Sequence, residues 1–176
     1  MNQIADQLAL TLSQIPGSDS TQLKDEISLY GEAVIKMLPA FQLISLLLDV
    51  FLAYLILQLL GAKLNFKIEK IKPFHLWRFW EGLTLILGAG LLLNIIGGKS
   101  LVFIGLNLIV ISSFWFIIQG LATIEFFFKK ANLKLFFKIV FYLFLGLTGI
   151  LSLFFLVLFG FLDSWFDFRK IKGALV

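Results

Sequence analysis

Four long apolar blocks dominate this chain of 176 residues and restrict the folds open to it. They cover residues 39–60, 79–96, 101–128 and 133–161 and contain few charged side chains. A water-soluble domain would expose much of this surface, because 60% of all residues are hydrophobic and the mean hydropathy is +0.97. A bilayer accepts such blocks as spanning helices. The sequence therefore predicts an all-α fold, a polytopic transmembrane helix bundle with about four spanning helices.

The region before these blocks predicts two amphipathic helices. Apolar residues recur at helical spacing from Met1 to Ile15 and again from about Ser20 to Leu38, and Pro16-Gly17 separates the two patterns. Pro39 suits the first turn of a helix, where its missing amide hydrogen is not needed, so we expect the first spanning helix to begin there.

These patterns divide the chain into two parts. We expect residues 1–38 to be extracytoplasmic or interfacial, against lipid or a partner, and residues 39–176 to form the transmembrane domain. The fourth block is longer than the hydrocarbon layer, so as one helix it would have to tilt or project.

Basic residues are concentrated between the blocks. The connections at residues 63–78 and 129–138 hold nine of the 15 Lys and Arg residues. The positive-inside rule places both connections in the cytoplasm of a bacterial inner membrane, with both termini extracytoplasmic. Basic residues that border apolar blocks orient helices, so we expect no nucleic-acid partner.

Composition also excludes several kinds of chemistry. The chain has no cysteine, so disulfides, thiolate metal sites and cysteine nucleophiles are absent. The single histidine, His75, lies in a basic connection without a recognisable nucleophile or orienting acid. We therefore expect no catalytic residues, no metal site and no cofactor, and predict that the protein is not an enzyme.

Asp49 is the most informative polar residue, because a carboxylate within an apolar span is costly and is normally directed at a partner, a polar cavity or a proton path. Gln42, Ser45 and Asp49 share one helical face. One interpretation is a ligand or ion contact. The other, which we favour, is a protonated or hydrogen-bonded Asp that joins two helices, or one that lies closer to the membrane surface.

Further polar side chains lie inside the later blocks, namely Asn94, Asn107, Ser112, Ser113, Gln119 and Thr123. They could line a pocket, but interhelical hydrogen bonds are the favoured role. Glu125 precedes Lys129 by one helical turn, which favours a local ion pair at the membrane surface.

The segment from Gly160 to Lys170 reads Gly-Phe-Leu-Asp-Ser-Trp-Phe-Asp-Phe-Arg-Lys. On a continuous helix, Asp163 and Asp167 would share one face, and Trp165 and Arg169 another. Paired carboxylates can hold a metal or perform acid-base chemistry, but an interfacial anchor of Trp and charges is the favoured interpretation.

This terminal segment resembles a motif of the YybS-like family of uncharacterised bacterial membrane proteins, and Gln119-Gly120-Leu121-Ala122 resembles a second motif of that family. The resemblance covers about Pro39 to Lys172 and corresponds to the later half of longer members. It implies a general similarity to the substrate-binding subunits of energy-coupling-factor transporters.

Two functional hypotheses follow. The first is a non-catalytic integral membrane subunit of a larger complex, whose partners are the lipid bilayer and other membrane subunits or further copies of the chain. The second is a small-solute transport or substrate-capture subunit, motivated by Asp49, Gln42 and Ser45 together with the family resemblance.

Overall fold

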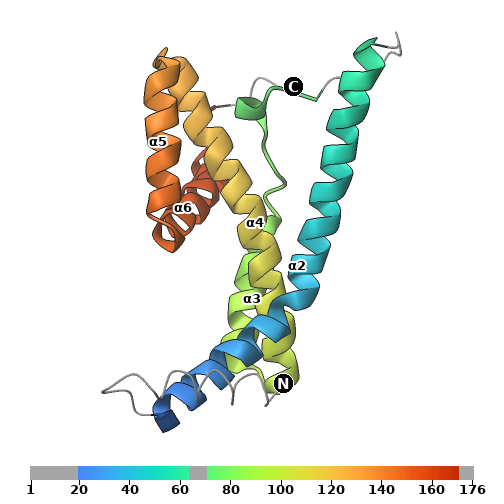
Figure 1. Cartoon of the computed structure of the whole chain (residues 1–176), viewed down its shortest axis with the longest axis vertical. Coiled ribbons are helices and arrows are strands. Elements are labelled where there is room, and N and C mark those ends of the chain that lie inside the picture. Colours follow the sequence, from blue (N-terminus) through green and yellow to red (C-terminus); the bar gives the residue numbers. More distant parts are fainter. Residues whose placement is uncertain (1–19, 64–70, 171–176) are drawn as a thin grey trace. The chain divides into compact units, whose positions relative to one another are not determined.

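The computed structural model describes residues 20–63 and 71–170, and all regular structure in these ranges is helical (Figure 1). The elements are α2 (Ser20–Lys63), η1 (Phe74–Leu76), α3 (Leu83–Ile96), α4 (Lys99–Lys130), α5 (Leu135–Leu147) and α6 (Ile150–Phe166). The predicted all-α class is therefore confirmed. The helix expected over residues 1–15 lies outside the described ranges.

The chain divides into two compact units, Met1–Pro39 and Ala40–Val176. The described part of the first unit belongs to α2. In the second unit, α4 is the central element, because α3, α6 and η1 all pack against it. All interactions discussed below lie within this second unit.

Pro39 does not begin a helix, contrary to the prediction, because α2 continues through it. The expected amphipathic helix and first spanning helix are one element. Pro39 has no amide hydrogen, and the next amide, on Ala40, donates to Oδ1 of Asn107 at 2.8 Å. This bond from α4 holds the amide that follows the proline, at the point where proline weakens the helical hydrogen bonds.

The second predicted span is shorter than expected, because helix α3 begins at Leu83 and not at Phe79. Residues 77–80 are non-helical and follow η1 along α4. At 1.5 Å per residue, α3 extends only about 21 Å, against a hydrocarbon layer of roughly 30 Å. The expected hairpin of α3 and α4 is confirmed, and a Cβ at Gly90 would lie 3.0 Å from the carbonyl oxygen of Gly105.

The fourth apolar block forms two helices, whereas the prediction was one. Helices α5 and α6 are separated at Thr148-Gly149 and bend by 115°. Gly149 has φ +56°, which side chains with a Cβ rarely adopt. The Ser152 hydroxyl donates to the carbonyl oxygens of Leu145 at 2.8 Å and Gly149 at 2.6 Å. The carbonyl oxygen of Leu145, at the break, therefore has a local partner.

Length and composition identify two membrane-spanning helices among the described residues, Gly31–Leu60 and Lys99–Lys130, or three if the bent pair of α5 and α6 is one span. The membrane helix class matches the prediction, whereas the count is lower than the four expected. The reasons are the shortness of α3 and the break between α5 and α6.

Candidate functional site

Helices α4 and α6 cross in close contact at two glycines. A Cβ at Gly120 would meet the carbonyl oxygen of Leu156, and a Cβ at Gly160 would meet that of Phe116. Phe116 is fully buried beside this crossing. Small residues allow such backbone contact in membrane helices. The two segments that carry the family resemblance, around Gln119 and around Asp163, therefore meet in space.

A polar cluster lies next to this crossing. The side chains of Asp163 and Arg169 are both fully buried and form an ion pair, with Nη2 of Arg169 at 2.7 Å from Oδ2 of Asp163. Nε of Arg169 also donates to Oδ2 at 3.1 Å, and Nε2 of Gln119 donates to the same oxygen at 3.1 Å. Arg169 therefore compensates the charge of Asp163, and Arg169 and Gln119 both donate hydrogen bonds to its carboxylate.

Arg169 reaches Asp163 because α6 ends at Phe166 and the chain turns back. Asp167 adopts a left-handed conformation with φ 45°, and its amide donates to the carbonyl oxygen of Asp163. The helix expected to continue through Arg169 is therefore interrupted. Trp165 remains 64% exposed, whereas Arg169 is directed inward, so the terminal motif has an exposed part and a buried part.

A second ion pair joins the same turn to the segment before α3. Nη1 of Arg78 donates to Oδ1 of Asp167, and Nη2 donates to the carbonyl oxygen of Ser164 at 3.1 Å. Glu81 accepts a further bond from Nη2 at 3.3 Å. Arg78 therefore fixes the end of α6 against the start of α3.

The cluster also satisfies the irregular backbone of residues 72–80. Nη1 of Arg169 donates to the carbonyl oxygen of His75 at 2.9 Å, and the amide of Phe79 donates to Oε1 of Gln119 at 3.4 Å. Within hydrocarbon, non-helical backbone is tolerated only where protein or water supplies such partners. We call Arg78, Gln119, Asp163, Asp167 and Arg169 the clasp, because their side chains hold this backbone and the end of α6 together. The charged groups of the clasp pair with one another. The buried hydroxyl of Ser164 has no hydrogen-bond partner among residues 20–63 and 71–170.

Basic side chains, including Lys129 and His75, lie close together near the end of α4. Nζ of Lys129 is 3.3 Å from Nε2 of His75. Burial, followed by the charge of Lys129, lowers the pKa of His75 below its usual value. The predicted ion pair of Glu125 with Lys129 is not formed. Glu125 instead pairs with Lys138 of α5 and accepts a hydrogen bond from Tyr142 at 3.1 Å. The partner comes from α5 because the rings of Phe141 and Tyr142 lie against Phe128 near the end of α4.

The remaining predicted site residues lie apart from the clasp. Gln42, Ser45 and Asp49 are all exposed on α2. Asn94 donates to the carbonyl oxygen of Gly90 within α3 at 2.9 Å, and Asn107 accepts from the amide of Ala40. Of the predicted ligand or helix-partner residues, only Gln119 joins the cluster. Among the residues with described placement, no group of three or more metal-ligating side chains comes together.

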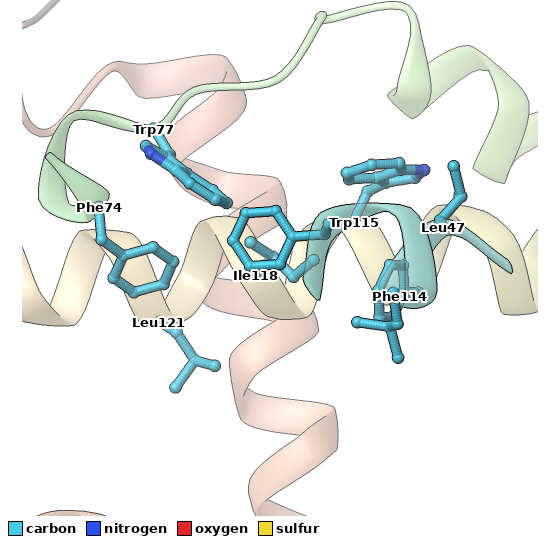
Figure 2. A pocket seen from close by; sticks show the side chains of 9 residues that line it. Leu47, Phe74, Trp77, Phe114, Trp115, Ile118 and Leu121 are labelled. Atoms are coloured by element: carbon cyan, nitrogen blue, oxygen red, sulfur yellow. The ribbon is translucent and has the colours of Figure 1, made fainter. Parts of the chain in front are cut away.

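An apolar cavity of about 310 Å³ lies between α2, the segment around η1, and α4. Figure 2 shows Leu47 of α2 together with Phe74, Trp77, Trp115 and other side chains that surround it. Nε1 of Trp77 donates to the carbonyl oxygen of Lys72 at 2.7 Å and so is engaged locally. The cavity accordingly suits an apolar occupant.

Sequence reasoning did not find Arg78 or the backbone of His75 and Phe79. Arg78 was interpreted only as a charge that orients helices. Its position directly before an apolar block was the available signal for a partner inside the fold.

The apolar helices and the internally compensated polar clasp define an α-helical integral membrane protein. Residues 1–164 match the family described as "Predicted membrane protein (DUF2232)". Because the match covers most of the chain, the protein belongs to this family. Comparison with curated proteins gave no match, and comparison with solved structures gave none.

Proposed function

We propose that this protein is a non-catalytic subunit of a larger complex in the bacterial inner membrane. The observation that carries this proposal is the isolation of its first span. Among the described residues, 0% of the most apolar stretch of Gly31–Leu60 is buried, compared with 17% for Lys99–Lys130. A spanning helix with so few contacts of its own has its surface available for lipid and for other subunits.

The clasp supports a structural role over a catalytic one. Asp163, Arg169 and Gln119 bind one another and the backbone, so none of their ionised groups is directed at open space. A catalytic acid, base or nucleophile needs access to a substrate atom. The resemblance to the later half of YybS-like proteins is compatible with a role as one part of a larger assembly.

We place the start of α2 outside the cytoplasm and the connection between α2 and α3 inside. For the end of α6 we favour the cytoplasmic side, in place of the extracytoplasmic side predicted from charge. The 115° bend directs α6 partly back along α5, and Arg169 contacts His75 beside Lys129. Basic residues at both positions agree with this orientation.

Gentle solubilisation of native membranes tests the proposal. The particle mass should exceed that of one chain plus detergent, with a second polypeptide in fixed ratio. A monodisperse single chain with no companion, obtained from membranes in which crosslinking also finds no neighbour, would contradict it.

A second candidate function, capture of a small apolar solute, is favoured by the cavity beside Trp77 and Trp115. Tryptophan fluorescence during titration with apolar solutes tests it, because an occupant would lie against both indole rings. Leu121→Trp, which fills the cavity, should abolish a saturable signal, whereas Leu85→Trp on exposed surface should preserve it.

A further inference from the structure

The surface of α2 that carries Asp49 differs from the side of this helix that contacts Asn107 and Trp77. Asp49 lies about 5 Å along the axis from the middle of the span Gly31–Leu60, at 1.5 Å per residue. Its side chain is exposed, and within residues 20–63 and 71–170 no hydrogen bond or ion pair to its carboxylate occurs. An uncompensated carboxylate at this depth costs roughly 2.5–3.5 kcal/mol.

The described residues of the second unit lie on another side of α2 and give Asp49 no partner. The side of α2 that contacts the rest of the second unit includes Ala40, bonded to Asn107, and Phe51, whose ring centroid is 5.5 Å from that of Trp77. At about 100° per residue, Asp49 points roughly 160° away from Phe51 around the helix. Asp49 therefore points away from the described part of the second unit.

The neighbouring positions suit a closely packed helix. Ser45 and Ala53 lie one turn before and one turn after Asp49 on the same side, and both are exposed. Small residues at four-residue spacing let two helix backbones approach. Gln42 continues the side with a further hydrogen-bonding group. We call Gln42, Ser45, Asp49 and Ala53 the Asp49 face.

We propose that the Asp49 face docks a spanning helix of a different protein, which carries an arginine or lysine at the same depth. This inference rests on the proposed function and names the chemistry of the partner. A second copy of this chain fits less well, because copies inserted in the same orientation would bring two Asp49 carboxylates together at one depth. A basic side chain instead compensates the charge and supplies the missing hydrogen bonds.

Photocrosslinking in native membranes tests this inference. A benzophenone amino acid replaces Ser45 in one variant and Val50 in a control, because Val50 is 69% exposed but lies about 100° around the helix from Asp49. We expect an adduct with one foreign membrane protein from position 45 only, and the linked partner helix should carry Arg or Lys near the crosslinked residue.

Asp49 variants then test the role of charge. Asp49→Leu makes the span more apolar, so insertion is preserved, yet the adduct yield should fall about tenfold or more because the partner's cation loses its counter-ion. Asp49→Asn should give a smaller loss. Asp49→Lys should abolish the adduct, and an acidic replacement of the partner's basic residue should restore it.

The outcomes separate this inference from the proposed function. Suppose that a complex persists on solubilisation. Adducts from position 50 but not 45, or an undiminished yield in Asp49→Leu, would then overturn the inference and leave the subunit role intact. An adduct between two copies of the chain would also overturn it. A monomeric particle without any adduct would overturn both.

Discussion

Asp163 and Arg169 are six residues apart in the chain, and both side chains are fully removed from solvent. The ion pair is surrounded by Gln119 and the carbonyl oxygen of His75, so each charge has more than one partner. Removal of one member of such a pair leaves the other buried and uncompensated, which is more costly than removal of both.

We therefore expect Asp163→Leu to lower the free energy of unfolding by about 3–5 kcal/mol. The measurement is unfolding in mixed micelles followed by circular dichroism. The double variant Asp163→Leu, Arg169→Met should recover more than half of the loss. Glu81→Gln serves as the control, because Glu81 is 56% exposed in its pair with Arg78. Equal losses for the control and Asp163→Leu would contradict a special role for the clasp.

His75 gives a pH dependence of defined sign. Its pKa is lowered in the folded protein by burial and by Lys129, so below about pH 6.5 the unfolded chain binds the proton more readily. Stability should thus be highest above this pH and decrease as the pH falls towards the folded pKa. The same unfolding assay from pH 7.5 to pH 5 should show a shallower decrease in His75→Gln. An unchanged slope would show that other groups dominate.

The crossing of α4 and α6 depends on a glycine from each helix. Gly160→Ala would place a methyl group on the carbonyl oxygen of Phe116, so we expect the helices to separate and about 1–3 kcal/mol of stability to be lost. Gly146→Ala in α5 is the matched control, because outside its own helix backbone no described atom lies within 4 Å of its Cβ position, and better helix propensity should stabilise it by up to about 1 kcal/mol. The ranking can be measured by thermal aggregation in detergent. Equal behaviour of the two variants would contradict close backbone packing.

Sequence periodicity and composition predicted most of the helical residues correctly, since apolar blocks in lipid have few alternatives to helix. Three interruptions were placed wrongly, at Pro39, at residues 77–82 and at Thr148-Gly149. At each of them the outcome depends on a hydrogen-bond partner: distant Asn107 for Ala40, distant Gln119 for Phe79, and Ser152, beyond the break, for Leu145. Asn107 and Gln119 are tertiary partners, which cannot be identified from one sequence, whereas Ser152 is a local partner of a break whose position the apolar pattern does not mark.

The candidate site was partly visible in the sequence. Gln119 and the segment around Asp163 were singled out, but their contact across 44 residues required the three-dimensional fold. The reversal of the chain at Asp167 was also hidden, because a non-glycine residue at φ 45° has no clear sequence signal.

At the scale of the whole molecule, the orientation of α6 predicts the side on which Lys170 lies. Because the natural chain has no cysteine, a single introduced cysteine is its sole thiol target. In oriented vesicles, Lys170→Cys should react with an impermeant maleimide from the same side as Lys130→Cys. Gly98→Cys, at the opposite end of α4, should react from the other side. If Lys170→Cys reacted from the same side as Gly98→Cys, the end of α6 would lie outside the cytoplasm.

The clasp also imposes an order on biosynthesis. Residues 72–80 leave the ribosome well before α6, yet the carbonyl of His75 receives its bond from Arg169, 94 residues later, and Arg78 receives its counter-ion from Asp167, 89 residues later. Until α6 has been inserted, this stretch must remain near water or under the protection of another protein. A nascent chain arrested before Asp163 should consequently be an early substrate for membrane proteases, although its long apolar helices are already in place.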